Sequence, residues 1–203
     1  MARELDKYSF EKYCYSERWN SYYHQIKEIA ELNPSSVLDV GAGDGFLGEY
    51  LRKRAKIIYK SVDNDESLKP DILASIEKIP VNGGSFDLVC AFEVLEHLPF
   101  ERFEQSLLEL KKASEKWIII SLPHFGPPIK FLFKAPFLKE LKFSFKIPFW
   151  IKHKTGGEHF WEIGKRGYSS RKIRKIIKKH FVILKEFIPF ENQYHHFYVL
   201  KKK

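Results

Sequence analysis

Short apolar runs alternate with segments of helical periodicity along most of the chain. Ser36–Val40 and Phe86–Phe92 are apolar runs of strand length, whereas Phe46–Arg54 and Glu101–Ser114 carry apolar residues at spacings of three and four. The same reasoning predicts further strands at Ile57–Val62, Asp71–Ala74, Trp117–Leu122, Phe181–Phe187 and His195–Leu200. Strands that alternate with helices predict an α/β fold with a mostly parallel sheet covered by helices on both faces.

The two ends of the chain extend this pattern. Residues 1–34 are predicted to form an N-terminal helical segment, because aromatic and apolar residues recur at helical spacing between Phe10 and Leu32. Near the other end, Ser169-Ser170 marks the start of a basic helix that runs to about His180. The two strands that follow it are expected to pair antiparallel, which completes a doubly wound sheet of seven strands.

The pattern breaks between residues 123 and 160, where Phe, Lys and Pro are interspersed. We interpret this stretch as an insertion after the fifth strand, partly helical and lying over one end of the sheet, within a single domain that spans residues 1–203. Aromatic residues interleaved with lysines suit a substrate cap with a small core of its own, which is our prediction. A surface for anionic lipid and a stacking platform for single-stranded nucleic acid are the alternatives.

The net charge and the cysteine content bear on the binding partners of the protein and on the cellular compartment in which it works. Among 203 residues, 35 are Lys or Arg and 26 are Asp or Glu, which gives a formal net charge of +9. That charge favours acidic partners such as phosphorylated small molecules, nucleic acids or anionic lipid, although a lysine-rich surface without a specific partner explains it equally well. Cys14 and Cys90 do not resemble a disulfide framework, and no signal peptide or membrane span is visible. We therefore expect a cytoplasmic protein.

The glycine-rich segment Gly41–Gly45 is the strongest local signal for a binding site. Glycines at its first, third and fifth positions permit conformations and close backbone approach that a side chain forbids, and the next helix points its N-terminal amides at whatever binds there. The spacing differs from that of dinucleotide folds, and Asp44 adds a carboxylate where a pyrophosphate would come close. Asp63, about 20 residues further on at a strand end, is placed to bond both hydroxyls of a ribose.

Three stretches resemble the class I S-adenosylmethionine-dependent methyltransferases, in particular the small-molecule type with a Leu-Glu-His segment after the fourth strand. They are Val37–Gly45, Ser61–Asp63 and Phe86–Leu98, the last of which contains Leu95-Glu96-His97. The resemblance covers roughly residues 35–122. It implies a Rossmann-like fold and S-adenosylmethionine as cofactor.

The resemblance also implies a set of cofactor contacts. Asp39 would bond the methionine ammonium directly or through water, and Asp63 would hold the ribose hydroxyls. Ser75 stands where the family often has an aspartate that reaches the adenine amino group, so this chain departs from the pattern there. The implied cofactor-binding residues are Asp39, Gly41, Ala42, Gly43, Gly45, Asp63, Asn64, Ser75, Phe92 and Glu93.

Candidates for contact with the methyl acceptor are fewer. His124 directly follows the fifth strand, at the sheet end where open α/β folds bind ligands. His159 and Glu162, near the end of the insertion, are candidates of similar standing. His97 is expected to pack the turn after the fourth strand. No histidine has tight ligand spacing with cysteine or carboxylate partners, so we expect no metal site.

These observations lead to one preferred function and two alternatives. We expect in-line methyl transfer to a small-molecule or lipid-linked acceptor, with possible peripheral contact to a membrane. An RNA methyltransferase is the alternative prompted by net charge and by the aromatic and basic insertion. A non-catalytic binding module with the same fold is the other. The acceptor, its reactive atom and the oligomeric state are left open.

Overall fold

The structure is a computed structural model that describes residues 8–147, 151–154 and 157–203. The first seven residues of the predicted N-terminal segment and five residues of the predicted insertion therefore lie outside the described part. The elements, in chain order, are α2 (Phe10–Tyr13), α3 (Ser16–Leu32), β1 (Ser36–Val40), α4 (Phe46–Arg54), β2 (Ile58–Asp63), η1 (Glu66–Leu68), β3 (Ile72–Leu73), β4 (Phe86–Phe92), η2 (Leu95–His97), η3 (Phe100–Arg102), α5 (Phe103–Ala113), β5 (Ser114–Pro123), β6 (Pro128–Phe133), β7 (Leu141–Lys146), α6 (Ser170–His180), β8 (Phe181–Phe187) and β9 (His195–Lys202).

The main sheet has seven strands in the order β3-β2-β1-β4-β5-β9-β8. The first five are parallel, and β9 runs antiparallel to both β5 and β8. The predicted doubly wound, mostly parallel seven-stranded sheet is thus confirmed. Strand order reverses at β1, so the loops after β1 and β4 diverge and leave space between them, the usual position of a ligand site in such folds.

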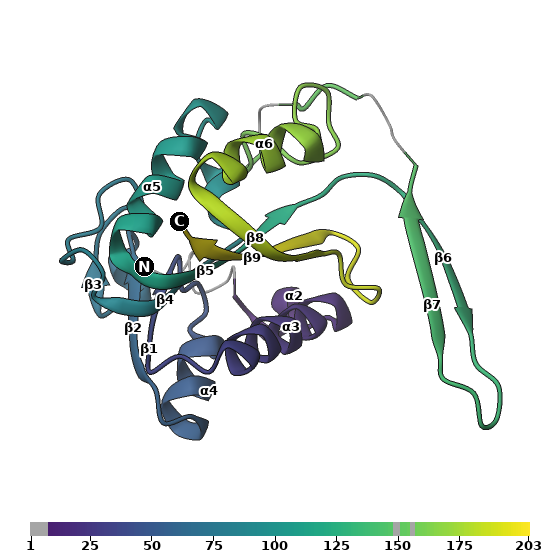
Figure 1. Cartoon of the computed structure of the whole chain (residues 1–203), viewed down its shortest axis with the longest axis horizontal. Coiled ribbons are helices and arrows are strands. Elements are labelled where there is room, and N and C mark those ends of the chain that lie inside the picture. Colours follow the sequence, from purple (N-terminus) through teal and green to yellow (C-terminus); the bar gives the residue numbers. More distant parts are fainter. Residues whose placement is uncertain (1–7, 148–150, 155–156) are drawn as a thin grey trace.

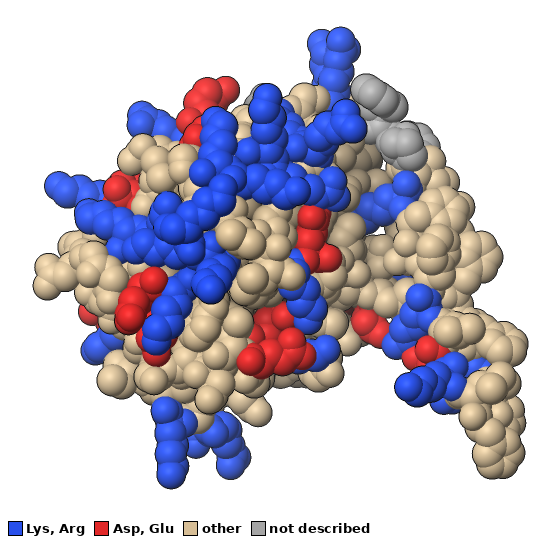
Figure 2. Space-filling view, in the orientation of Figure 1, with Lys and Arg blue, Asp and Glu red and all other residues tan. Residues whose placement is uncertain are grey.

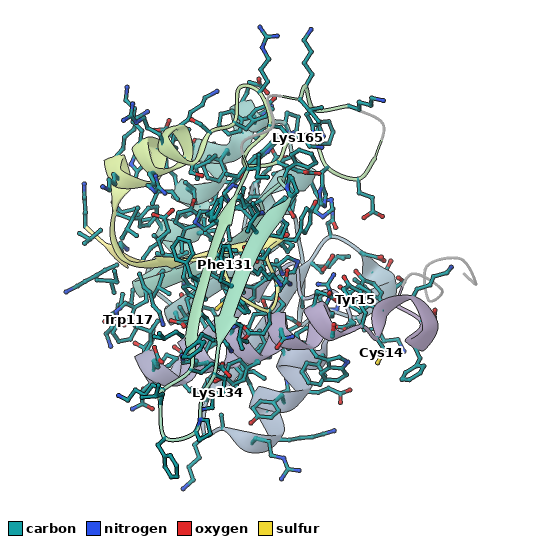
Figure 3. The ribbon with its side chains drawn as sticks, turned by 90° about the vertical axis from the view of Figure 1, so that its right-hand side faces the viewer. Cys14, Tyr15, Trp117, Phe131, Lys134 and Lys165 are labelled. Carbon is teal, nitrogen blue, oxygen red and sulfur yellow. The ribbon has the colours of Figure 1, made fainter. Side chains whose placement is uncertain are left out.

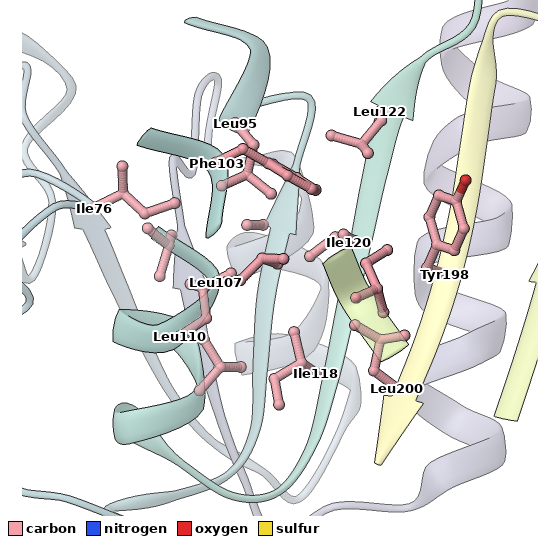
Figure 4. Packing of buried hydrophobic residues seen from close by; sticks show 14 of the residues in the cluster. Ile76, Leu95, Phe103, Leu107, Leu110, Ile118, Ile120, Leu122, Tyr198 and Leu200 are labelled. Carbon is pink, nitrogen blue, oxygen red and sulfur yellow. The ribbon is translucent and has the colours of Figure 1, made fainter. Parts of the chain in front are cut away.

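Helices cover both faces of this sheet, with α3 and α4 on one side and α5 and α6 on the other (Figure 1). The central strands are buried on both faces, which explains why β4 and β5 read as continuous apolar runs rather than as alternating ones. In β5, Ile118 and Ile120 pack toward α5, where they meet Leu107 and Leu110 (Figure 4), whereas Ile119 packs toward α3. The two cores hold the strand ends that form the site.

Trp161 anchors the chain segment that returns from the insertion. Its side chain is 0% exposed, and its ring packs edge-on against Phe100 and Phe103. The indole Nε1 donates a hydrogen bond to the carbonyl oxygen of Leu98 at 3.1 Å. The residues beside Trp161 in sequence are therefore held against the segment that follows β4.

The insertion is not helical in its described part, so this element of the prediction is wrong. Strands β6 and β7 pair antiparallel from Pro128↔Lys146 to Phe133↔Leu141, and this hairpin projects from the body as an arm (Figure 1). Isoleucine and phenylalanine favour strands, and both strands of the hairpin are rich in them. Phe131 of β6 lies opposite Phe143 of β7. The base of the arm is tied to the β8–β9 loop, where Gln193 donates to the Ser144 hydroxyl at 3.1 Å.

Candidate cofactor and acceptor site

The glycine loop turns sharply between β1 and α4. Gly41 has φ +77°, and a Cβ atom there would lie 2.3 Å from Cγ2 of Val94, so a side chain at this position would collide with the segment after β4. The Gly41 amide donates to the carbonyl oxygen of Val62 at 2.7 Å, which fixes the loop to the end of β2. Gly45, with φ +75°, is the N-cap residue of α4.

A cleft of about 330 Å³ opens between the ends of β1, β2 and β4. This volume falls at the lower end of the range that small-molecule ligands occupy in proteins. Six of the ten predicted cofactor-binding residues line it, namely Gly41, Gly43, Asp63, Asn64, Ser75 and Glu93. The sequence analysis did not assign the other residues of its wall to the cofactor site, which are Tyr8, Val40, Val62, Asp65, Leu68, Ala74, Ile76, Val94, His97 and Leu98.

Asp63 connects the glycine loop with the end of β2. Its Oδ1 accepts a hydrogen bond from the Asp65 amide at 3.0 Å, and its Oδ2 lies 3.5 Å from the Gly43 amide nitrogen. The second contact is long, so this oxygen retains most of its capacity to accept a hydrogen bond. A carboxylate in this position suits a pair of vicinal hydroxyls.

A smaller hollow of about 40 Å³ lies beside the same loop and contains Asp39, Ala42 and Phe92. Asp39 is buried, and its Oδ2 accepts a hydrogen bond from the Tyr59 hydroxyl at 2.7 Å. Burial raises the pKa of Asp39 to about 6, although the Tyr59 hydrogen bond acts in the opposite direction. The buried carboxylate therefore has no cationic group beside it that offsets its burial, and the ammonium group of a ligand could take this place. Of the predicted cofactor-binding residues, only Gly45 lines neither space.

Arg18 of α3 supplies positive charge to the hollow and was missed by the sequence analysis. Its guanidinium lies 4.2 Å from the centroid of the Tyr13 ring, and its Nε atom is buried without a hydrogen-bond partner among the described residues. A buried guanidinium nitrogen without a partner is costly, so this atom suits a ligand oxygen. Only the packing of α3 against the loop identifies Arg18, because no motif surrounds it.

Two glutamates follow β4 at the other end of the cleft. Glu93 adopts φ +55°, a strained conformation for a residue with a side chain, and one of its carboxylate oxygens is buried without a partner among the described residues. Glu96 is 0% exposed. Burial raises the pKa of Glu93 to about 8 and, together with the charge of Glu93, raises that of Glu96 well above its usual range.

His159 and Glu162 meet this acidic end. His159 Nδ1 lies 3.5 Å from Glu162 Oε1, and its ring lies 5.0 Å from that of His97, centroid to centroid. Burial alone would raise the pKa of Glu162, but His159 and the Lys165 ammonium, 3.3 Å away, lower it to about 2. His97 both packs the turn after β4 and lines the cleft, so it does more than the sequence predicted.

His124 lies apart from these residues. Its Nδ1 is 3.0 Å from Nδ1 of His196, and burial is the main cause that lowers its pKa to about 3. It lines two other cavities, of about 570 and 470 Å³, at the base of the arm and does not line the cofactor cleft. The structure thus brings His159 and Glu162 together but leaves His124 outside their cluster.

Comparisons with known proteins agree with this geometry. Residues 38–116 match the family described as methyltransferase domain, whereas no curated protein matches the chain. Magnesium protoporphyrin IX methyltransferase from Synechocystis PCC 6803, solved with bound S-adenosylmethionine, has a similar structure (14% identity, TM-score 0.65, 100% of this chain and 92% of that chain).

Two further solved structures are similar. One is an S-adenosylmethionine-dependent methyltransferase from Clostridium acetobutylicum (15% identity, TM-score 0.61, 98% of this chain and 96% of that chain). The other is 1,6-didemethyltoxoflavin-N1-methyltransferase from Burkholderia thailandensis, solved with 1,6-didemethyltoxoflavin and S-adenosylhomocysteine (14% identity, TM-score 0.54, 91% of this chain and 85% of that chain).

The strand order and these solved structures show the Rossmann-like α/β fold of class I methyltransferases, and the region that matches the methyltransferase-domain family contains the glycine loop and the ends of β2 and β4. The solved structures of the Synechocystis protein contain S-adenosylmethionine in one case and S-adenosylhomocysteine in the other. No helix in the described part of the chain is long and apolar enough to cross a membrane.

Proposed function

We propose that this chain is an S-adenosylmethionine-dependent methyltransferase. It would act on a small, lipid-linked acceptor, which reaches the cofactor cleft at its acidic end. The observation that carries the proposal is the continuity of the cleft wall from Asp63 through Gly41 to Glu93 and His97, next to which His159 lies. Cofactor and acceptor would thus lie end to end, as in-line transfer requires.

The residues around the glycine loop fit the cofactor. Bound S-adenosylmethionine supplies an electrophilic methyl group on a sulfonium centre. The Arg18 Nε atom without a partner and the buried Asp39 carboxylate offer opposite charges to the carboxylate and the ammonium of the methionine portion. Asp63 would hold the ribose hydroxyls, with Asn64 and Ser75 near the adenine. Because the charges match in sign and place, the residues present fit this group.

The residues at the acidic end would orient the acceptor and take its proton. Alignment of a nucleophile with the methyl group supplies most of the rate of such a reaction, because little covalent chemistry is asked of the protein. A hydroxyl or ammonium nucleophile must also lose a proton. His159, held by Glu162 and with the Tyr194 hydroxyl 3.4 Å from its Nδ1, is positioned for both tasks.

The projecting arm favours a lipid-linked acceptor. Most of its large apolar side chains are exposed, and Phe137 at its tip is fully so. The arm stands clear of the body, and its surface combines uncharged side chains with lysines (Figure 2); Phe131 and Lys134 both lie on it (Figure 3). Isolated exposed apolar residues are ordinary, but a contiguous patch marks an interaction surface, and lysines beside it suit anionic lipid. The exposed apolar residues are Phe131, Leu132, Phe133, Phe137, Leu138, Leu141, Phe143 and Phe145.

Flotation with vesicles tests the lipid contact. Vesicles that contain phosphatidylglycerol should bind the protein, and neutral phosphatidylcholine vesicles should bind it more weakly. The double variant Phe137→Ser and Leu138→Ser should lose most of this binding. Ile58→Ser is a matched control, because Ile58 is also an exposed apolar residue but lies on β2, away from the arm. Equal binding by the variant and the wild-type protein would contradict the proposed role of the arm.

Transfer of a labelled methyl group tests the acceptor class. Label should enter the organic phase of a lipid extract, and His159→Gln should abolish its incorporation. Label that enters only water-soluble small molecules would contradict the lipid link. Label that enters RNA, together with RNA binding that weakens steeply with salt, would favour the alternative that acts on RNA.

A further inference from the structure

Three potential metal ligands converge beside the cofactor cleft. Glu96, His97 and His159 each offer one ligand atom, and these atoms all lie within 4.8 Å of one another. Glu96 and His97 belong to η2, whereas His159 lies 62 residues later and is held in place by the neighbouring Trp161. This separation explains why spacing in the sequence gave no sign of a metal site.

The Glu96 carboxylate has no adequate partner in the described structure. It is 0% exposed, and neither of its oxygens makes a hydrogen bond with the described residues. The distance from Glu96 Oε1 to His159 Nε2 is 3.8 Å, which is too long for a hydrogen bond. Two ligands on one zinc ion, each about 2.0–2.1 Å from it in tetrahedral geometry, lie about 3.3 Å apart. A small side-chain movement would therefore place both atoms on a common cation.

The hydrogen bonds of the two histidines show which ring nitrogen of each can act as a metal ligand. His97 Nδ1 lies 3.0 Å from the carbonyl oxygen of Glu158, which can only accept, so Nδ1 carries the proton and Nε2 carries the lone pair. His159 turns Nδ1 toward Glu162 and Nε2 toward Glu96. Partners on the outer nitrogen of each ring are the usual arrangement around metal-binding histidines.

We propose that Glu96, His97 and His159 bind a divalent transition-metal ion at the acceptor end of the cleft. Two imidazoles and one carboxylate suit ions such as Zn²⁺ and Mn²⁺ and leave positions open on the ion. An acceptor oxygen would occupy one of these positions, where the metal lowers the pKa of a hydroxyl. This role in catalysis rests on the proposed function, and with the ion bound His159 would act as a metal ligand and not as the proton acceptor. The binding of the metal itself does not rest on the proposed function.

Metal titration of protein stripped with a chelator tests the binding without any acceptor or cofactor. Calorimetry with Zn²⁺ and with Mn²⁺ should give one site per chain, and Co²⁺ should give a visible spectrum typical of mixed nitrogen and oxygen ligands. Glu96→Gln keeps the shape of the side chain and should weaken Zn²⁺ binding more than 100-fold. Glu162 orients His159 but is not itself a ligand, so Glu162→Gln should weaken Zn²⁺ binding by about 10- to 100-fold.

The matched control is His180→Ala. His180 also lies next to a carboxylate, with Nε2 2.7 Å from Glu104 Oε1, but it belongs to α6 and is not part of the cluster. This variant should bind Zn²⁺ as tightly as the wild-type protein. Absence of one-to-one binding and of the Co²⁺ spectrum in the wild-type protein would overturn the proposal, whichever variants fold. So would equal Zn²⁺ affinities of the wild-type protein and Glu96→Gln.

Discussion

Asp39→Asn should stabilise the protein in the absence of cofactor and weaken the binding of S-adenosylhomocysteine. Asp39 is buried, and its pKa is raised from 3.8 to about 6, mainly by burial. When folding raises the pKa of a carboxyl group, the protonated form contributes its full stability at a pH below the pKa of the unfolded state. This contribution is lost as the pH rises through the pKa of the folded state. Above pH 6 the ionised carboxylate therefore costs about 3 kcal/mol.

The size of the effect follows from two opposing terms. Asparagine removes the cost of the buried charge, which already includes the Tyr59 hydrogen bond, but it buries an amide NH2 group in place of a carboxylate, a loss of about 1 kcal/mol. The net gain at pH 8 is about 2 kcal/mol, or an increase in Tm of roughly 4–8 °C for a chain of this size. At pH 4 the wild-type carboxyl is protonated in the folded state and only partly ionised in the unfolded state, so most of the cost is gone and the two proteins should differ far less in stability.

Thermal unfolding at pH 4 and pH 8, together with calorimetric titration, measures both effects. Loss of a charge-assisted bond to the ligand ammonium costs about 1.5–3 kcal/mol, so affinity should fall by about 10- to 150-fold. Asp87→Asn is a control of opposite sign, because Lys116, 2.8 Å away, lowers the pKa of Asp87 and the variant should lose stability at pH 8. An Asp39→Asn protein that is destabilised at pH 8, or that binds the ligand with unchanged affinity, would refute the reasoning.

Three further changes test the packing and the electrostatics of the fold. Trp161→Ala should cost about 3–5 kcal/mol in urea unfolding, whereas Phe160→Ala, at an exposed neighbour, should cost far less. Gly41→Ala should lower both stability and ligand affinity, because the new Cβ atom would collide with Val94. The additional change Val94→Ala should restore only part of the lost stability, because residue 41 still has a positive φ. The pKa of Glu186 is lowered to about 2, so its stabilisation is present above about pH 4.5 and lost toward pH 2; Glu186→Gln should flatten the acid limb of the stability profile.

Elements with strong local patterns could be predicted from the sequence, and arrangements that depend on long-range packing could not. The seven strands, α4, α5 and α6 follow from apolar runs and from signals such as the Ser169 cap, which accepts a hydrogen bond from the Lys172 amide. The β6–β7 hairpin was missed because its lysines and prolines obscured the strand alternation. On this ribbon both faces are largely exposed, so no buried face imposes a clear period on the sequence.

The site divides in the same way. The loop after β1 and the acidic end of β2 lie next to each other because parallel strands end at one edge of the sheet, so Gly41 and Asp63 could be predicted from their places in the chain. Arg18 and the cluster of Glu96 with His159 could not, because they meet only when α3 and the segment around Trp161 pack against the body. Candidates such as His124, chosen by position after a strand, lie at the correct sheet end but line a different cavity.

The central claim is that the cleft at Gly41 and Asp63 is the cofactor site. Calorimetric titration with S-adenosylhomocysteine, with NADH as a control ligand, tests it most directly in wild-type protein and in Asp63→Ala. We predict one-to-one binding of S-adenosylhomocysteine by the wild-type protein, no binding of NADH, and severe loss of affinity in Asp63→Ala. Failure of the wild-type protein to bind S-adenosylhomocysteine, or unchanged affinity in Asp63→Ala, would contradict this account of the site.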